Sequence, residues 1–183
     1  MDPITEDLMA AGHDDAALLF SAAYRSFSPG VAGYLRAGGV EDPEGVTHDV
    51  FLALYTRLKA VRGGTQGLRV LIFSIAHARL VDHHRRRTRM PAPAEYDPGR
   101  DERLSASAED VALDGNAEAN ALALLEGLRE DHREVLRLRI IAELSVNDVA
   151  YIMQKSPGAV TQLQHRAMAS LRNQLRAKNG VPT

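Results

Sequence analysis

Apolar residues recur at helical spacing along almost the whole chain, and this pattern excludes most fold classes. Ala16, Leu19, Phe20, Ala23 and Phe27 follow the i, i+3, i+4 rule that places side chains on one helix face. The alternation typical of half-buried strands is almost absent. The chain is therefore predicted to be all-α, and an apolar content of 45% is enough for packed cores.

Glycine and proline divide residues 14–89 into four predicted helices. The first covers 14–27 and ends at Ser28-Pro29-Gly30, and a short second helix follows to about Arg36. The third begins at Asp42-Pro43, because Asp42 can cap free N–H groups and proline suits the first turn. It continues to Val61 and ends at Gly63-Gly64. Thr65 is expected to cap the fourth helix, which stops before Pro91.

The chain divides into two small helical domains joined by a flexible acidic linker. Residues 93–114 are rich in Pro, Ala, Ser and acidic residues, with 7 acidic against 2 basic side chains. The first domain, 1–92, has 11 basic and 10 acidic residues, and the second, 115–183, has 9 and 7. This weak basic excess at both ends is compatible with nucleic-acid contact.

The second domain begins with an apolar ridge of Leu122, Leu125 and Leu128. Asp131 is expected to cap a helix whose apolar face carries Val135, Leu136 and Ile140. Ser145 and Asp148 have the spacing of a capping box at the next helix.

Ser156 is expected to cap a longer helix with Pro157 in its first turn. The short helix after Ser145, a tight turn near Gln154 and this longer helix have the layout of a helix-turn-helix. In such motifs the second helix enters the DNA major groove. The polar face expected to meet bases and phosphates consists of Lys155, Ser156, Pro157, Thr161, Gln162, Gln164, His165 and Arg166. An ordinary helical hairpin with a solvated face remains the alternative.

The basic run at 83–89 also has two readings. It can bind a phosphate backbone, or it can be a solvated helix C-terminus where cations are favoured.

Several classes of function are not expected. The chain has no cysteine, which fits a reducing cytoplasm, and no apolar run long enough to insert in a membrane. His77, Asp82, His83 and His84 do not share one helical face, so no metal site is predicted. No nucleophile–base pattern or phosphate loop is present, so neither a cofactor nor catalysis is expected.

Residues 128–167 resemble region 4 of the sigma-70 family. The matching segments are Arg133-Glu134-Val135-Leu136, Leu138-Arg139, Leu144-Ser145, Val149-Ala150, Gly158, Val160 and Arg166-Ala167. Residues 42–54 and 68–87 resemble region 2, with Ile75-Ala76, Arg79 and Asp82 in place. The two regions in this order, with only a linker between them, resemble an extracytoplasmic-function (ECF) sigma factor.

This resemblance implies a promoter-specificity subunit that binds the RNA polymerase core and promoter DNA. The third helix would dock on the β′ clamp helices through Asp49, Val50, Phe51 and Leu54, and region 4 would meet the β flap. The loop 62–67 would hold a flipped base of the minus-ten element. The residues implied there are Arg62, Gly63, Gly64, Thr65, Gln66, Phe73, His77, Arg79, Arg85, Arg86 and Arg87. The helix after Ser156 would read the minus-thirty-five element. An anti-sigma protein would regulate the sigma factor by binding regions 2 and 4.

Some residues depart from the family pattern. The chain has no Trp, so Phe73 and His77 are the remaining stacking candidates at the minus-ten site. Gln154 replaces a frequent glycine in the helix-turn-helix, and a left-handed residue there would cost on the order of 1 kcal/mol. A stand-alone helix-turn-helix regulator that binds duplex DNA without polymerase is the alternative function.

Overall fold

The computed structural model describes residues 16–89 and 124–178. All secondary structure within these two ranges is helical, so the all-α prediction is confirmed. The N-terminal unit, residues 16–89, contains α2 (Ala16–Ala37), α3 (Pro43–Tyr55), the short 3₁₀ turn η1 (Leu58–Ala60) and α4 (Gly64–Arg89). The C-terminal unit, residues 124–178, contains α6 (Glu130–Leu136), the π-helical turn η2 (Arg137–Ile141), α7 (Val146–Ile152) and α8 (Pro157–Lys178).

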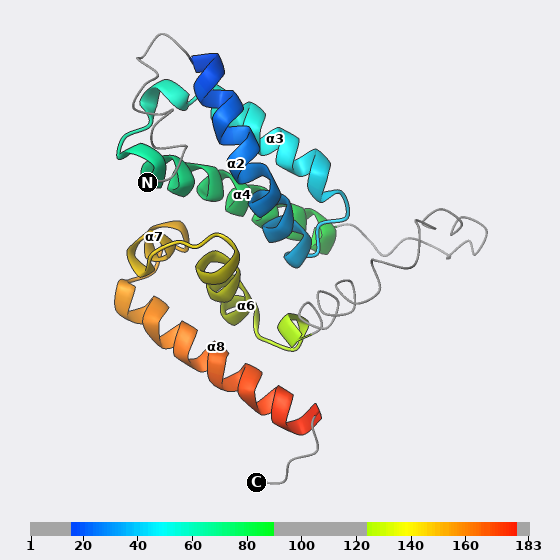
Figure 1. The fold of residues 1–183 in the computed structure, drawn as a ribbon. Helices are drawn as coiled ribbons and strands as arrows, with labels where there is room; N and C mark the ends of the chain where they lie inside the picture. Colours follow the sequence, from blue (N-terminus) through cyan, green and yellow to red (C-terminus); the bar gives the residue numbers. More distant parts are fainter. Residues whose placement is uncertain (1–15, 90–123, 179–183) are drawn as a thin grey trace, which may run out of the picture.

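In the N-terminal unit, α2 packs against both α3 and α4, and α3 also packs against α4 (Figure 1). Apolar side chains from all three helices are buried between them, among them Val31, Phe51, Leu54, Leu68 and Ile72. The start of α3 is as predicted: Asp42 Oδ1 accepts the N–H of Gly45 at 2.9 Å, and Pro43 occupies the first turn.

The predicted break at Ser28-Pro29-Gly30 is wrong, because α2 continues through Pro29. A proline inside a helix leaves the carbonyl four residues earlier without its partner and costs about 3 kcal/mol. Pro29 lies on the exposed side of α2, so water can reach that carbonyl. The opposite side buries Phe27, Val31 and Leu35, each contributing roughly 1.5–3 kcal/mol, so packing outweighs the lost hydrogen bond.

Two of the three predicted caps in the C-terminal unit are confirmed. Ser145 and Asp148 form a complete capping box at α7, with both backbone contacts at 3.2 Å. Ser156 Oγ accepts the N–H of Ala159 at 3.2 Å at the start of α8. Asp131 is not a cap: α6 begins after Arg129, and Asp131 lies in the first turn, where it pairs with Lys155 at 3.4 Å.

Ile140 was predicted on the buried face with Val135 and Leu136, but its side chain is 63% exposed. The cause is η2, whose wider turn breaks the 3.6-residue spacing after Leu136. The apolar ridge is described only in part: Leu125 and Leu128 pack on the core, whereas Leu122 and the predicted linker 93–114 lie outside the described residues.

The two units lie against each other, with α2 beside η2 and α4 beside α7 (Figure 1). That the two units are separate domains, and that a flexible acidic linker joins them, remain predictions. Across the described residues, no helix combines the length and apolar character that a membrane span needs.

The turn between α7 and α8 can be tested at Gln154, the residue of that turn with a positive φ. Gln154 has φ +53°, a left-handed conformation that favours glycine. We expect Gln154→Gly to raise the free energy of unfolding by about 0.5–1 kcal/mol, measured by urea denaturation. The matched control is Gln162→Gly within exposed α8, where we expect a loss of about 1 kcal/mol. A loss at both positions would contradict the assigned turn.

Candidate nucleic-acid interface

The helix-turn-helix presents a polar, exposed helix start. Packing of α8 on α6 and α7 buries Val160 and Ala167, which leaves the opposite face in solvent. The exposed predicted residues on and before α8 are Ser156, Pro157, Thr161, Gln162, His165 and Arg166. Two others are partly engaged: Gln164 accepts a hydrogen bond from Arg139 Nε at 3.1 Å, and Lys155 pairs with Asp131.

Residues 62–67 were predicted to form a loop, but Gly64 to Gly67 form the first turn of α4. Gly63 and Gly64 have φ of +83° and +60°, and a Cβ on Gly67 would lie 1.7 Å from the Arg62 carbonyl oxygen. The segment therefore needs its glycines, whereas its approach to a flipped base remains a prediction. Arg62 donates to the carbonyls of Lys59 and Val61, Thr65 is half-buried, and Gln66 is exposed. Thr65 does not cap α4, which begins one residue earlier.

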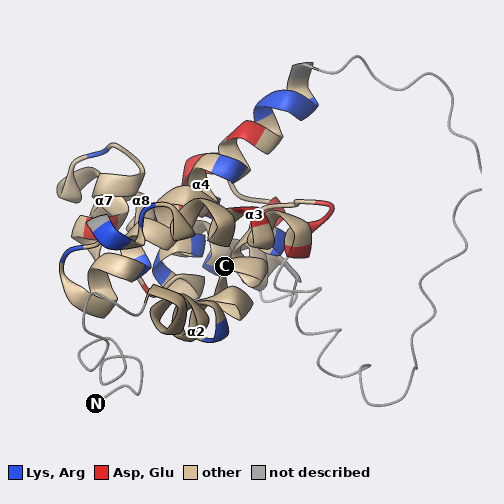
Figure 2. Ribbon diagram, turned by 90° about the horizontal axis from the view of Figure 1, so that it is seen from above, with Lys and Arg blue, Asp and Glu red and all other residues tan. Residues whose placement is uncertain are grey.

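The stacking candidates on α4 are not accessible to a base in this structure. Phe73 is only 2% exposed and meets the ring of Tyr34 edge-on, with centroids 5.8 Å apart. His77 is half-buried and bonded to Glu134. Four basic residues further along α4 are exposed, namely Arg79, Arg85, Arg86 and Arg87. Figure 2 marks the Lys and Arg positions of the ribbon in blue.

The side chains predicted to contact polymerase on α3 require a correction. Val50, Phe51 and Leu54 are at most 1% exposed, so in this structure they belong to the core and only Asp49 is available. The outer face instead presents Leu52, 53% exposed, and Tyr55, 56% exposed. Beside them, a cavity of about 370 Å³ is lined by residues of α2 and α3, namely Phe20, Ser21, Tyr24, Arg25, His48, Phe51 and Leu52.

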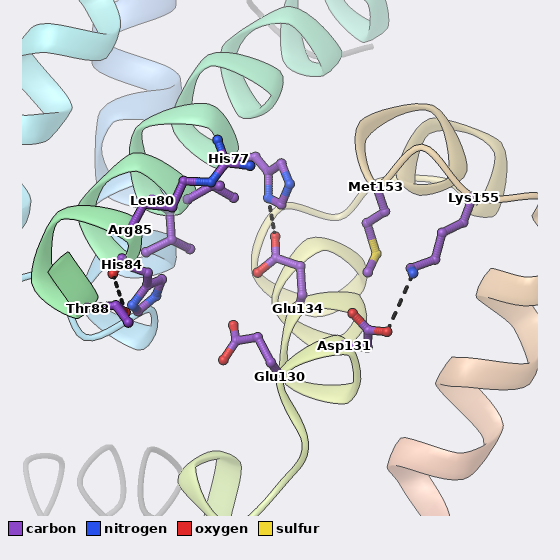
Figure 3. Close-up of a pocket in the computed structure, with 11 residues that line it drawn as sticks. His77, Leu80, His84, Arg85, Thr88, Glu130, Asp131, Glu134, Met153 and Lys155 are labelled. Carbon is purple, nitrogen blue, oxygen red and sulfur yellow. Dashed lines mark hydrogen bonds and ion pairs between the residues drawn. The ribbon is translucent and has the colours of Figure 1, made fainter.

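A buried polar cluster joins the two units. Glu134 Oε1 accepts a hydrogen bond from Tyr34 of α2 at 2.5 Å. It also accepts one from His77 of α4 at 2.7 Å (Figure 3). Its other oxygen pairs with Arg137 Nη2 at 2.6 Å. Arg137 also donates to Glu130 and to the carbonyl of Ala37 on α2.

The cluster shifts the pKa values of its members. Burial raises the pKa of the Tyr34 hydroxyl well above its ordinary value, and the charge of Glu134 adds to this effect. Burial also acts to raise the pKa of Glu134, but the His77 hydrogen bond and the charge of Arg137 outweigh it. The pKa of Glu134 is consequently lowered from 4.5 to about 2, so this carboxylate is ionised at neutral pH.

A cavity of about 630 Å³ lies beside the cluster (Figure 3). Its walls include His77, Leu80 and His84 from α4, and Glu130 and Glu134 from α6. Within residues 16–89 and 124–178, no three histidine or acidic side chains converge as metal ligands.

Comparison with known proteins assigns the family. Residues 124–173 match the family model "Sigma-70, region 4", a range that covers α7 and all but the last five residues of α8. The chain is 34% identical over 156 residues to the ECF RNA polymerase sigma factor SigD of Mycobacterium tuberculosis, covering 80% of this chain and 72% of that protein. It is 31% identical to the ECF sigma factor ShbA of Streptomyces griseus, covering 92% and 85%.

The chain belongs to the ECF RNA polymerase sigma factors. Its fold agrees: the structure of CnrH in complex with the cytosolic domain of CnrY superposes with a TM-score of 0.66 at 20% identity, covering 96% of each chain.

Sequence reasoning about this sigma factor missed two groups of residues. Leu52 and Tyr55 are large apolar residues that do not fall on the periodic apolar face of α3. Their position in the sequence could have indicated an exposed apolar patch. Tyr34 and Glu134 are separated by 100 positions, and no local pattern indicates that they meet.

The low pKa of Glu134 predicts how stability changes in acid. Because the folded-state pKa lies below the unfolded value, the stabilisation is complete above about pH 4.5 and is lost as pH falls toward 2. We expect Glu134→Gln to be less stable than the wild type at pH 7. Between pH 4.5 and 2 it should lose less stability than the wild type does. Urea denaturation at pH 7, 4.5 and 2.5 measures both quantities, and equal acid losses in the two proteins would contradict the assignment.

Proposed function

We propose that this sigma factor directs the RNA polymerase core to promoters as a binding subunit with no chemistry of its own, acting in the cytoplasm. The N-terminal unit would bind the core and the minus-ten element, and the C-terminal unit would bind the minus-thirty-five element. The observation that carries this proposal is the exposed polar start of α8, within the segment that matches sigma-70 region 4.

Helix α8 has the chemistry needed to read a major groove. An amide such as Gln162 can bond an adenine edge with two contacts, and Arg166 can bond guanine or a phosphate. Thr161 Oγ1 donates to the carbonyl of Pro157 at 3.0 Å, so its oxygen remains able to accept a bond. The N-terminus of α8 also favours phosphate through the helix dipole.

For the minus-ten element, we assign residues 62–67, at the start of α4, and the exposed arginines of α4. The glycines let backbone come close to an extruded base, and Arg79 with Arg85, Arg86 and Arg87 would hold the single strand by charge. Phe73 would support Tyr34 and the core, so we do not assign it to base stacking.

For the polymerase core, we assign the outer face of α3. Asp49, Leu52 and Tyr55 are exposed there, and Tyr24 of α2 extends the patch. Exposed apolar side chains grouped in this way are typical of protein interfaces. By family resemblance the partner would be the β′ clamp helices, and the C-terminal unit would meet the β flap.

Regulation by an anti-sigma protein is also proposed. CnrH was solved in complex with the cytosolic domain of CnrY, and that fold is shared here. Purification of the native protein under inducing and non-inducing conditions tests the idea. A stoichiometric partner that blocks transcription supports it, and a protein that is always alone contradicts it.

Run-off transcription with purified core polymerase tests the function directly. We expect transcripts from specific genomic promoters, and a Gln162→Ala loss of roughly 5- to 100-fold, because one bidentate base contact contributes about 1–3 kcal/mol. The matched control is Arg176→Ala, which is exposed nearer the end of α8. Specific duplex binding without polymerase, together with no promoter-specific transcript, would favour the stand-alone regulator.

A pair of neighbouring substitutions tests the docking surface. We expect Phe51→Ala to lower the free energy of unfolding by roughly 3–5 kcal/mol, because its ring is buried. Leu52→Glu should leave melting unchanged but weaken association with core polymerase about tenfold or more. Ser26→Glu, which adds the same charge at an exposed position of α2, is the control. Undiminished core binding by Leu52→Glu would contradict the assignment.

A further inference from the structure

Two glutamines of α8, two positions apart, differ in their hydrogen bonding. Gln162 is exposed, and its amide has no partner within the part of the chain that the structure describes. Gln164 is half-buried, and its Oε1 accepts a hydrogen bond from Arg139 Nε of η2 at 3.1 Å. Gln162 can therefore turn both ends of its amide toward a base, whereas Gln164 has its oxygen end engaged.

The chemistry of arginine fixes which way the Gln164 amide points. A guanidinium carries five N–H donors and no acceptor, so only the amide oxygen can face Arg139. The amide nitrogen consequently lies on the other branch. Among the residues of 16–89 and 124–178, none accepts a hydrogen bond from that nitrogen, and solvent reaches it. Gln164 thus keeps one N–H donor group that an oxygen or nitrogen of DNA could accept.

Arg139 is itself held in place. Its Nη1 donates to the carbonyl oxygen of Leu144, a fully buried residue that directly precedes the Ser145 cap of α7. One planar group therefore joins η2 to the start of α7 and to α8. Because a guanidinium is rigid, the bond to Leu144 also restricts the direction of the N–H that meets Gln164.

We propose that Arg139 is a positioning residue for the minus-thirty-five element, because it holds the Gln164 amide so that Gln164 meets DNA only as a donor. The acceptor is a phosphate oxygen or an acceptor atom of guanine or thymine. A preference for adenine needs both ends of an amide, and it is left to Gln162. This inference rests on the proposed function of α8.

The substitution Gln164→Glu tests the donor. A carboxylate oxygen still accepts from Arg139, so the internal bond is kept, whereas the N–H donor is replaced by a charged acceptor. We expect run-off transcription with core polymerase to fall about tenfold or more, the effect of losing one hydrogen bond to a charged oxygen. The control is Gln174→Glu, the same change further along α8. It should alter transcription by no more than about twofold, because its charge is screened from the start of the helix.

A promoter library randomised across the minus-thirty-five element identifies the acceptor. If the acceptor is a phosphate, Gln164→Glu should lower transcription from all sequences alike. If it is a base, only sequences with guanine or thymine at one position should lose transcription. Either pattern supports the proposal. Unchanged transcription by Gln164→Glu would overturn it, because the Arg139–Gln164 bond would then be a purely internal brace. Loss of a preference for adenine would overturn it as well.

A double-mutant cycle tests the part played by Arg139. Arg139→Lys keeps the charge and a donor for Leu144, but it lacks the planar fork that reaches Gln164 at the same time. We expect Gln164→Ala to lower transcription about fivefold or more in the wild type and less than about twofold in the Arg139→Lys background. Equal losses in the two backgrounds would contradict the positioning role. If Arg139→Lys does not fold, Gln164→Glu decides alone.

The same assays separate the possible failures. A wild type without promoter-specific transcripts would defeat the proposed function itself. An active wild type with an equally active Gln164→Glu variant would defeat only the role assigned to Arg139 and Gln164.

Discussion

The carboxylate of Glu134 is the interaction on which the arrangement of this structure depends. A buried carboxylate is costly unless it is fully bonded, and Glu134 is bonded by one residue from each of three helical segments. Tyr34 and His77 come from the N-terminal unit and Arg137 from its own. Without these donors the charge would have to return to water, and α6 could not remain against α2 and α4. One side chain thereby sets how the two units face each other.

The consequence for a sigma factor is that α4 carries both contacts to the C-terminal unit and the residues that we assign to the minus-ten element. Besides His77, which meets Glu134, α4 carries Gln66 and the exposed arginines of that assignment. The other assigned surfaces, on α3 and at the start of α8, stay in solvent in the same structure.

Local chemistry made much of the fold predictable. Asp42, Ser145 and Ser156 start helices where their side chains cap, and the helix-turn-helix follows from two of these signals. Predictions failed where tertiary packing overrode a local rule: burial of Phe27 and Val31 carries α2 through Pro29, and the π-helical turn exposes Ile140. At the site, motif matching named Val50, Phe51 and Leu54 of α3, which are buried, because it aligns positions without their burial. The Tyr34–Glu134 contact was invisible, since nothing local marks two residues so distant in sequence.

The most direct test of this account is a distance measurement between the two units. Spin labels on cysteines at Glu41 and Ala169, both exposed and outside every assigned surface, report the separation by pulsed electron resonance. The account predicts a single narrow distribution for the wild type and a broader one for Glu134→Ala, which removes the carboxylate that Tyr34 and His77 contact. The same narrow distribution in both proteins would contradict it, as would a broad distribution in the wild type.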